Sequence, residues 1–373
     1  MSRLNLVIAD HNTRYMNNLA TFILSNYRHR FNVQTFSDRD SLYSTFPELQ
    51  EKTDVLLLSG DWYADWSNKP DGVLTITFDS EPRSGHSYGT ITIDRFCGAD
   101  SLIGNILKIY AEQDGSQYSI ESVRGTSDNK VIIVYAPCGG VGRTSISIGL
   151  SAIHTKKRHQ TLYLNLDGQS VDEFAFGASE SSGLSEIIFS LKTRPEKLGL
   201  KLEALKRVHP HGQFYYYTSP QYPLDLDEIK TAELETLINR LRTLGIFDRI
   251  LIDVPCGLTV KNKMLLELAD SILVVSECSQ IGIQKLLAEK KKMDKVFLDQ
   301  AQYIYKRSTI LLNKADELNQ SLVKIILKQA EEVFRSKAFV LPYCEFVSGN
   351  YSVEDIVCLK HKFGRALAEL VNI

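Results

Sequence analysis

The segment KVIIVYAPCGGVGRTSISIGL, residues 130–150, restricts the fold more than any other part of the sequence. Its first half is a continuous run of β-branched and aromatic residues, which predicts a strand buried on both faces. Three glycines follow within four residues, and a helical pattern follows them. A strand, a glycine-rich turn and a helix start form the layout of a loop that binds phosphate through backbone N–H groups. We therefore expect a parallel α/β domain with a nucleotide site at this loop.

The loop departs twice from the usual pattern G-x-x-x-x-G-K-[ST]. Pro137 stands at the first glycine position, and Arg143 stands at the lysine position. Arginine keeps the positive charge and binds phosphate with two N–H groups, so we expect binding to survive. The hydroxyl of Thr144 is a predicted Mg²⁺ ligand. The loop residues that we expect at the nucleotide are Cys138, Gly139, Gly140, Val141, Gly142, Arg143, Thr144 and Ser145.

Two further segments predict carboxylates beside this loop. TLYLNLDGQ (161–169) is an expected strand that ends in Asp167, and FDRILIDVPCGL (247–258) is an expected strand that ends in Asp253. An Asp at a strand end also serves as a turn or helix cap. The order of the three segments favours the nucleotide site, with Asp253 on the metal side.

Strand-like and helical runs also alternate before this domain, which predicts a second doubly wound α/β domain. The stretch AEQDGSQYSIESVRGTSDNK (111–130) is polar and rich in Ser, Gly and Asp, as linkers are. The predicted organisation is a first domain at 1–113, a linker at 114–128 and a nucleotide domain at 129–373.

The first domain resembles a response-regulator receiver, which has a flavodoxin-like fold. In that family an acidic pair ends the first strand, a phosphoacceptor Asp ends the third and a Lys ends the fifth. Here the corresponding positions carry Asp10-His11, Ser59 and Arg95, with Asp61 two residues beyond Ser59. Without a cluster of carboxylates the Mg²⁺ ligands are missing. We expect a receiver-like domain without a phosphoacceptor, used for docking or dimerisation.

The nucleotide domain resembles the MinD/ParA group of deviant Walker A ATPases, whose loop is K-G-G-x-G-K-[ST] and whose next strand ends in D-x-D. The resemblance implies that Arg143 replaces the phosphate-binding lysine and Cys138 the signature lysine that acts across a dimer. It implies that Asn165 replaces the first Asp of D-x-D. Asp167 would orient the attacking water, and Asp253 would hold the metal.

The same resemblance implies residues around the base. Asn313 in STILLNKADEL is similar to the asparagine that contacts adenine, and Pro342 and Tyr343 in AFVLPYCEFV are similar to the segment that covers the base. The implied cofactors are ATP and Mg²⁺, with Thr144 and Asp253 as the Mg²⁺ ligands.

A receiver-like domain joined to such an ATPase resembles the TadZ/CpaE family of tight-adherence (Flp) pilus localisation factors. The resemblance implies a homodimer, a position at the cell pole or membrane periphery, and recruitment of the pilus secretion machinery. Because Cys138 carries no charge at the partner's γ-phosphate, we expect slow or absent hydrolysis. The alternatives are an active MinD/ParA-like ATPase that cycles between membrane-bound or partner-bound and free states, and a redox relative with a cluster near Cys138 and Cys256.

Composition limits the other functions. A net charge of −2 gives no electrostatic basis for bulk nucleic-acid binding. Six cysteines without a C-x-x-C pair predict neither disulfides nor a zinc site, as in a reducing cytoplasm. The N-terminal segment MSRLNLVIAD lacks the apolar core of a signal peptide, and no apolar run approaches the roughly 20 residues that span a bilayer. For the amphipathic segment 353–373 we expect core packing, with membrane contact as the lesser alternative.

Overall fold

The computed structural model describes residues 3–28, 30–79, 91–112, 129–168, 183–220, 222, 224–316, 318–345, 347 and 352–371. By the contacts between residues, the chain divides into two units. The first comprises Met1–Val123 and Gly199–Leu205, and the second comprises Arg124–Leu198 and Lys206–Ile373. The expected linker at 114–128 lies outside the described residues.

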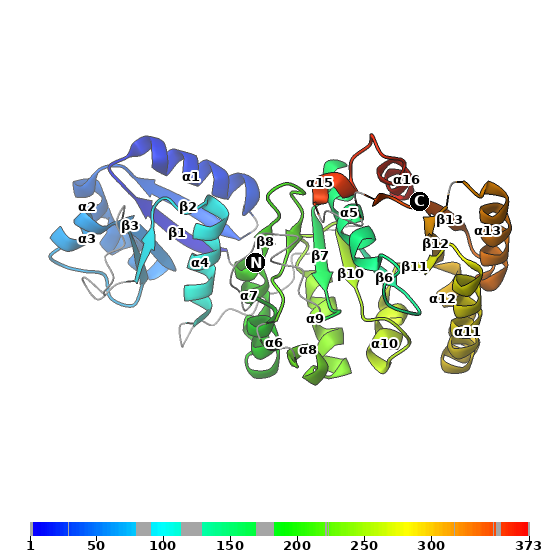
Figure 1. The fold of residues 1–373 in the computed structure, drawn as a ribbon. Coiled ribbons are helices and arrows are strands. Elements are labelled where there is room, and N and C mark those ends of the chain that lie inside the picture. The colour runs from blue at the N-terminus through cyan, green and yellow to red at the C-terminus, as the bar shows by residue number, and fades with distance from the viewer. Residues whose placement is uncertain are drawn as a thin grey trace. The chain divides into compact units, whose positions relative to one another are not determined.

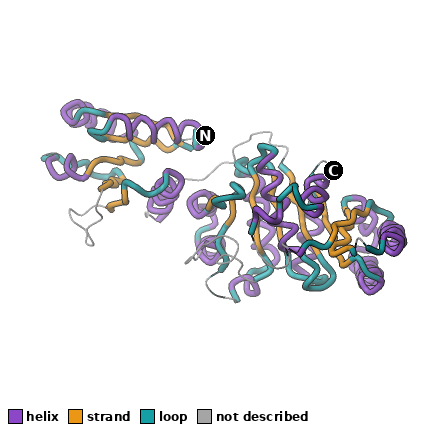
Figure 2. Tube along the Cα trace, turned by 45° about the horizontal axis from the view of Figure 1, so that its top comes forward, coloured by secondary structure: helices purple, strands orange, loops and turns teal. Residues whose placement is uncertain are grey.

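A five-stranded parallel sheet forms the centre of the first unit (Figures 1 and 2). Its strand order is β2-β1-β3-β4-β5, so the direction of winding reverses beside β1. The inner strands β1 and β3 are the apolar runs LNLVIA and VLLLS, as a sheet covered on both faces requires. The strands are β1 (Leu4–Ala9), β2 (Phe31–Phe36), β3 (Val55–Ser59), β4 (Leu74–Asp79) and β5 (Ile91–Asp94).

Helices cover both faces of this sheet. The apolar residues of α1 and α4 pack on one face, and those of α2 and α3 pack on the other. This arrangement confirms the predicted doubly wound fold. The helices are α1 (Thr13–Asn26), α2 (Arg39–Leu49), α3 (Gly60–Asp65) and α4 (Ala99–Glu112), with a 3₁₀ turn at Gln50–Lys52.

A short helix from later in the chain, α7 (Leu198–Leu205), supplies residues to the first unit. Leu200 is fully buried in the core that α1 and α4 form. Glu203 and Arg30 form an ion pair in which both side chains are almost completely buried. Removing either partner would leave an uncompensated buried charge, which typically costs about 3–5 kcal/mol. The first unit is therefore not a contiguous piece of sequence.

The second unit contains an eight-stranded sheet of order β13-β12-β11-β6-β10-β7-β9-β8. All neighbouring strands are parallel except β8 and β9. The central strand β6 is KVIIVY, the apolar run that opens the loop segment. The strands are β6 (Lys130–Tyr135), β7 (Thr161–Asn165), β8 (Arg207–Val208), β9 (Tyr215–Tyr216), β10 (Arg249–Asp253), β11 (Ser271–Glu277), β12 (Ser308–Ala315) and β13 (Ala338–Pro342).

Helix α5 connects β6 to β7, which lies on one side of β6 in the sheet. Helices α10, α11 and α13 follow β10, β11 and β12 and lead to β11, β12 and β13, which lie on the other side of β6. Right-handed crossovers therefore place α10, α11 and α13 on the face opposite α5 (Figure 1). The helices are α5 (Arg143–Lys156), α6 (Gly183–Thr193), α8 (Asp225–Glu228), α9 (Thr231–Thr243), α10 (Val260–Leu268), α11 (Gln280–Phe297), α12 (Ala301–Lys306), α13 (Gln320–Phe334), α15 (Val353–Ile356) and α16 (Lys362–Leu370), with 3₁₀ turns at Pro195–Lys197 and Leu298–Gln300.

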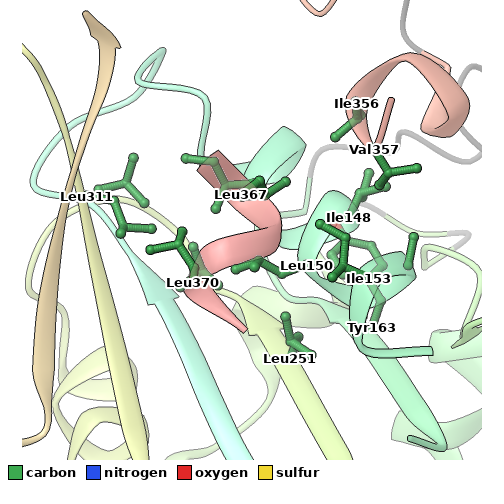
Figure 3. Packing of buried hydrophobic residues seen from close by; sticks show 14 of the residues in the cluster. Ile148, Leu150, Ile153, Tyr163, Leu251, Leu311, Ile356, Val357, Leu367 and Leu370 are labelled. Atoms are coloured by element: carbon green, nitrogen blue, oxygen red, sulfur yellow. The ribbon is translucent and has the colours of Figure 1, made fainter. Parts of the chain in front are cut away.

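The C-terminal helices pack on α5 (Figure 3). Ile356 and Leu367 are fully buried, and a Cβ added to Gly149 of α5 would collide with both side chains. The apolar face of α16 therefore belongs to the core of the second unit. Within the described part of the chain, no helix has the length and apolarity that crossing a membrane requires.

His154, near the end of α5, predicts a pH-dependent stability. Burial, followed by the charge of Arg249, lowers the pKa of His154 to about 4. Since the unfolded side chain titrates near 6.5, the unfolded state binds the extra proton between about pH 6.5 and pH 4. Stability is complete above this window and decreases as the pH falls through it. We expect a loss of about 2 kcal/mol of unfolding free energy between pH 7 and pH 5, from the roughly 1.4 kcal/mol that each pKa unit represents.

Urea unfolding followed by circular dichroism at both pH values measures this loss. His154→Leu should remove the dependence, while His361→Gln, at a half-buried histidine before α16, should keep it. An equal pH dependence in wild type and His154→Leu would contradict the assignment.

Candidate nucleotide-binding site

The glycine-rich loop joins β6 to α5 through two glycines in left-handed backbone conformations. The φ angles are 76° at Gly140 and 88° at Gly142, values that other residues rarely adopt. Gly142 directly precedes α5, and a Cβ there would also collide with the amide nitrogen of Asn313. The loop therefore requires glycine at position 142 for two separate reasons.

A cavity of about 390 Å³ opens above this loop. Six segments that are distant in sequence meet at it, and they bring together every predicted nucleotide residue and Asp167. Asp253 does not line the cavity, and it is fully buried beneath it. The lining residues are Cys138, Gly139, Gly140, Val141, Gly142, Arg143, Thr144, Ser145, Asp167, Cys256, Asn313, Lys314, Pro342, Tyr343, Cys344, Val347 and Phe363.

The guanidinium of Arg143 lies between two carboxylates. Its Nε donates to Asp253 Oδ1 at 2.5 Å, and its Nη2 lies 2.8 Å from Asp167 Oδ2. Burial lowers the pKa of Arg143, but the two carboxylates outweigh this effect and raise it above its ordinary value. The remaining nitrogen, Nη1, is buried and has no hydrogen-bond partner among the described residues.

An unpaired buried N–H costs free energy, and an anion in the cavity would supply the missing acceptor. A phosphate oxygen is suited to a guanidinium because the hydrogen bond is charge-assisted. The orphaned Nη1 of Arg143 therefore points to an anionic ligand at the loop.

Asp253 is held from three sides. Besides Arg143, the hydroxyl of Thr144 bonds to its carboxylate, and Tyr163 Oη lies 3.4 Å from Oδ2. Burial raises the pKa of Asp253, whereas the charge of Arg143 and the hydroxyl of Thr144 lower it. A hydroxyl and a carboxylate side by side are hard oxygen ligands that fit Mg²⁺. Because Arg143 holds the same carboxylate, a metal ion at Asp253 would compete with this ion pair.

The strand that was predicted to end in Asp167 ends two residues earlier, at Asn165. The Oδ1 atom of Asn165 accepts a hydrogen bond from the backbone N–H of Asp167 at 2.9 Å, so this side chain terminates the strand and shapes the turn. Asp167 is thereby presented from the turn toward Arg143.

The end of β12 supports the loop from the other side. Asn313 Nδ2 donates to the carbonyl of Val141 at 2.8 Å, and Lys314 Nζ donates to the carbonyl of Gly140 at 2.7 Å. Lys314 was not among the predicted site residues. Its position directly after Asn313 at a strand end was a usable signal, since the ends of parallel strands meet at one edge of the sheet.

The corresponding edge of the first unit is closed by a different arginine. Arg95 forms an ion pair with the fully buried Asp10, and its guanidinium lies 5.1 Å from the ring centres of both Tyr15 and Phe78. Ser59, the last residue of β3, donates a hydrogen bond from its hydroxyl to Asp61. The acidic position is thus neutralised by the protein itself.

Comparisons with known proteins concern the second unit. A family model described as an AAA domain matches residues 129–302. The structure is similar to a ParA family ATPase from Chlorobium tepidum (18% identity, 65% of this chain and 99% of that chain, TM-score 0.52). It is also similar to an Aquifex aeolicus MinC:MinD cell division complex (16%, 65% and 94%, TM-score 0.51) and to a Cyanothece McdA(D38A)–ATP complex (17%, 66% and 96%, TM-score 0.51). No curated protein sequence matches the chain. The second unit has the fold of the MinD/ParA-type P-loop NTPases.

Gly142→Ala should destabilise the second unit by roughly 2 kcal/mol, because alanine strains a left-handed residue by about 1–2 kcal/mol and its Cβ also displaces Asn313. Gly139→Ala is the matched control, since nothing lies within 4 Å of its added Cβ and its backbone is not left-handed. Urea unfolding of both variants measures the difference. Equal stability of the two variants would contradict the constraint at Gly142.

Proposed function

We propose that the second unit binds a nucleoside triphosphate with Mg²⁺ and uses the bound state as a conformational signal, with slow hydrolysis. The bridging of Asp253 and Asp167 by Arg143 carries this proposal. The resemblance to MinD/ParA proteins implies ATP, and one structural neighbour is a complex with ATP.

The bridge couples ligand binding to the geometry of the site. A triphosphate at the loop offers acceptors to the orphaned Nη1 and competes with both carboxylates for the guanidinium. Mg²⁺, held by Thr144 and Asp253, would supply charge neutralisation to the phosphates. As Arg143 turns toward the phosphates, Asp167 loses its partner and the turn that carries it is free to move. Binding therefore changes the exposed surface next to Asp167.

Hydrolysis is slow in this proposal for a chemical reason. The loop position that would carry a lysine in the related ATPases carries Cys138, which supplies no positive charge to the transition state. Loss of such a cation typically reduces the rate by orders of magnitude. The bound triphosphate thus persists long enough to act as a signal.

The cellular role that we propose is that of a TadZ/CpaE-type localisation factor. The chain would form a homodimer in the triphosphate state and recruit pilus secretion proteins, with the receiver-like unit as a docking or dimerisation module. The Aquifex MinD neighbour in a complex with MinC supports a partner-binding role. No nucleic-acid partner is expected, and the site of action would be cytoplasmic, at the cell pole or membrane periphery.

Phosphate release and size-exclusion chromatography with light scattering test this function on the full chain. We expect slow release of phosphate by the wild type. With a non-hydrolysable triphosphate the wild type should form a dimer, and Arg143→Ala should stay a monomer. Fast release that Asp167→Ala abolishes would instead support an active, cycling ATPase.

Cys138→Lys should raise the rate of phosphate release by tenfold or more, because it restores a cation at the loop. Cys256→Lys is the matched control, since it adds the same charge elsewhere on the cavity lining. An unchanged rate in Cys138→Lys would show that another feature limits hydrolysis.

A further inference from the structure

A second cavity, of about 580 Å³, lies in the same unit beside the turn that carries Asp167. Its walls come from that turn, from α8 and the residues around it, from α9, and from α10 with the loop before it. Asp167 is the one described residue that lines both this cavity and the cavity above the glycine-rich loop. The volume is that of a pocket for a small molecule, which typically measures about 300–1,000 Å³.

Most of the lining side chains are apolar. Ile229, Leu234 and Leu265 are buried and form one part of the wall. Leu224 and Val260 form another part, and they are 63% and 73% exposed. A molecule in the cavity would cover apolar surface that otherwise faces water, which favours the binding of an apolar ligand.

Lys261 ties two walls of the cavity together. Its Nζ donates to the carbonyl of Leu226 at 2.6 Å and to the carbonyl of Asp227 at 2.7 Å, so the start of α10 is joined to α8. These contacts fix the distance between the two helices without a ligand. The cavity is therefore formed in advance, which lowers the entropy cost of binding.

Asn262 supplies a polar group that selects among apolar ligands. This lining residue is 1% exposed, and its Nδ2 donates to the carbonyls of Pro255 and Gly257, both at 2.7 Å. Because a carbonyl only accepts hydrogen bonds, the amide nitrogen has to face these two groups, and the orientation of the amide is fixed. The remaining atom, Oδ1, is buried and has no hydrogen-bond partner among the described residues.

A buried acceptor without a partner costs free energy, and a hydroxyl or N–H group on a ligand would remove that cost. An apolar ligand without such a donor would exclude water from Oδ1 and leave it unpaired. The orphaned Oδ1 of Asn262 therefore favours apolar molecules that carry a donor over those that do not.

We propose that this cavity binds a small apolar molecule that carries a hydroxyl or N–H donor. The donor bonds to Asn262 Oδ1, and the apolar part of the molecule lies against Leu224, Val260 and the buried leucines. The site is separate from the glycine-rich loop, so the inference goes beyond the proposed function and does not depend on it.

Isothermal titration calorimetry of the full chain with 1-octanol and with its isomer 1-methoxyheptane tests the requirement for a donor. The two molecules have the same composition, but only the alcohol has an O–H group. We expect the alcohol to bind about tenfold more tightly, because an unsatisfied buried acceptor typically corresponds to roughly 5- to 150-fold in affinity.

Leu224→Trp tests the position of the site. The larger side chain should fill the cavity and weaken the binding of 1-octanol by tenfold or more, and position 224 tolerates the change because its side chain is exposed. Leu359→Trp is the matched control, since Leu359 is 61% exposed and does not line the cavity. This variant should bind 1-octanol as the wild type does.

Each contrary outcome overturns a stated part of the proposal. Failure of 1-octanol to bind the wild type overturns the site itself. Equal affinities for the two isomers overturn the role of Asn262 and the requirement for a donor. Binding of 1-octanol that Leu224→Trp does not weaken overturns the assignment to this cavity. The proposed nucleotide binding is unaffected by all three results.

Discussion

The ion-pair bridge from Arg143 to Asp253 and Asp167 is the interaction on which the second unit's site depends. It joins the start of α5, the end of β10 and the turn after β7, three segments that the chain order keeps far apart. One guanidinium between two carboxylates leaves a net negative charge, and its Nη1 atom has no hydrogen-bond partner among the described residues. An anion would supply an acceptor to Nη1, and a cation would offset the remaining negative charge.

Besides this bridge, side chains from β12 hold the loop by its backbone carbonyls. Asn313 and Lys314 bind loop carbonyls from one side, and the buried helix α5 continues the loop on the other. Packing of α15 and α16 against Gly149 fixes α5 in turn. Substitutions in the C-terminal helices therefore reach the candidate site through packing on α5, and Phe363 of α16 also lines the cavity directly.

The two units share a way of neutralising an acidic strand end. Arg95 neutralises Asp10 in the first unit, and Arg143 neutralises Asp253 in the second. In both arginines one buried nitrogen has no hydrogen-bond partner among the described residues, Nε in Arg95 and Nη1 in Arg143. Their surroundings differ, because Arg143 lines a cavity while Arg95 pairs with Asp10 beside two aromatic rings. The cavity, and not the unpaired nitrogen alone, makes the second arrangement a candidate ligand site.

The sequence alone determined the doubly wound fold, because apolar periodicity and the glycine-rich turn are local properties of residues 130–150 and of the strands before them. It also located the loop residues. It placed the end of β7 two residues late, because the hydrogen bond from the Asp167 N–H to Asn165 ends the strand and a hydrophobic pattern does not reveal such a bond. The tertiary structure alone decided the two partners of Arg143, the contact of Lys314 with the loop and the inclusion of Glu203 in the first unit. These contacts join residues that are distant in sequence and that meet because of the strand order and the crossover direction. A local sequence pattern does not show which distant residues will meet.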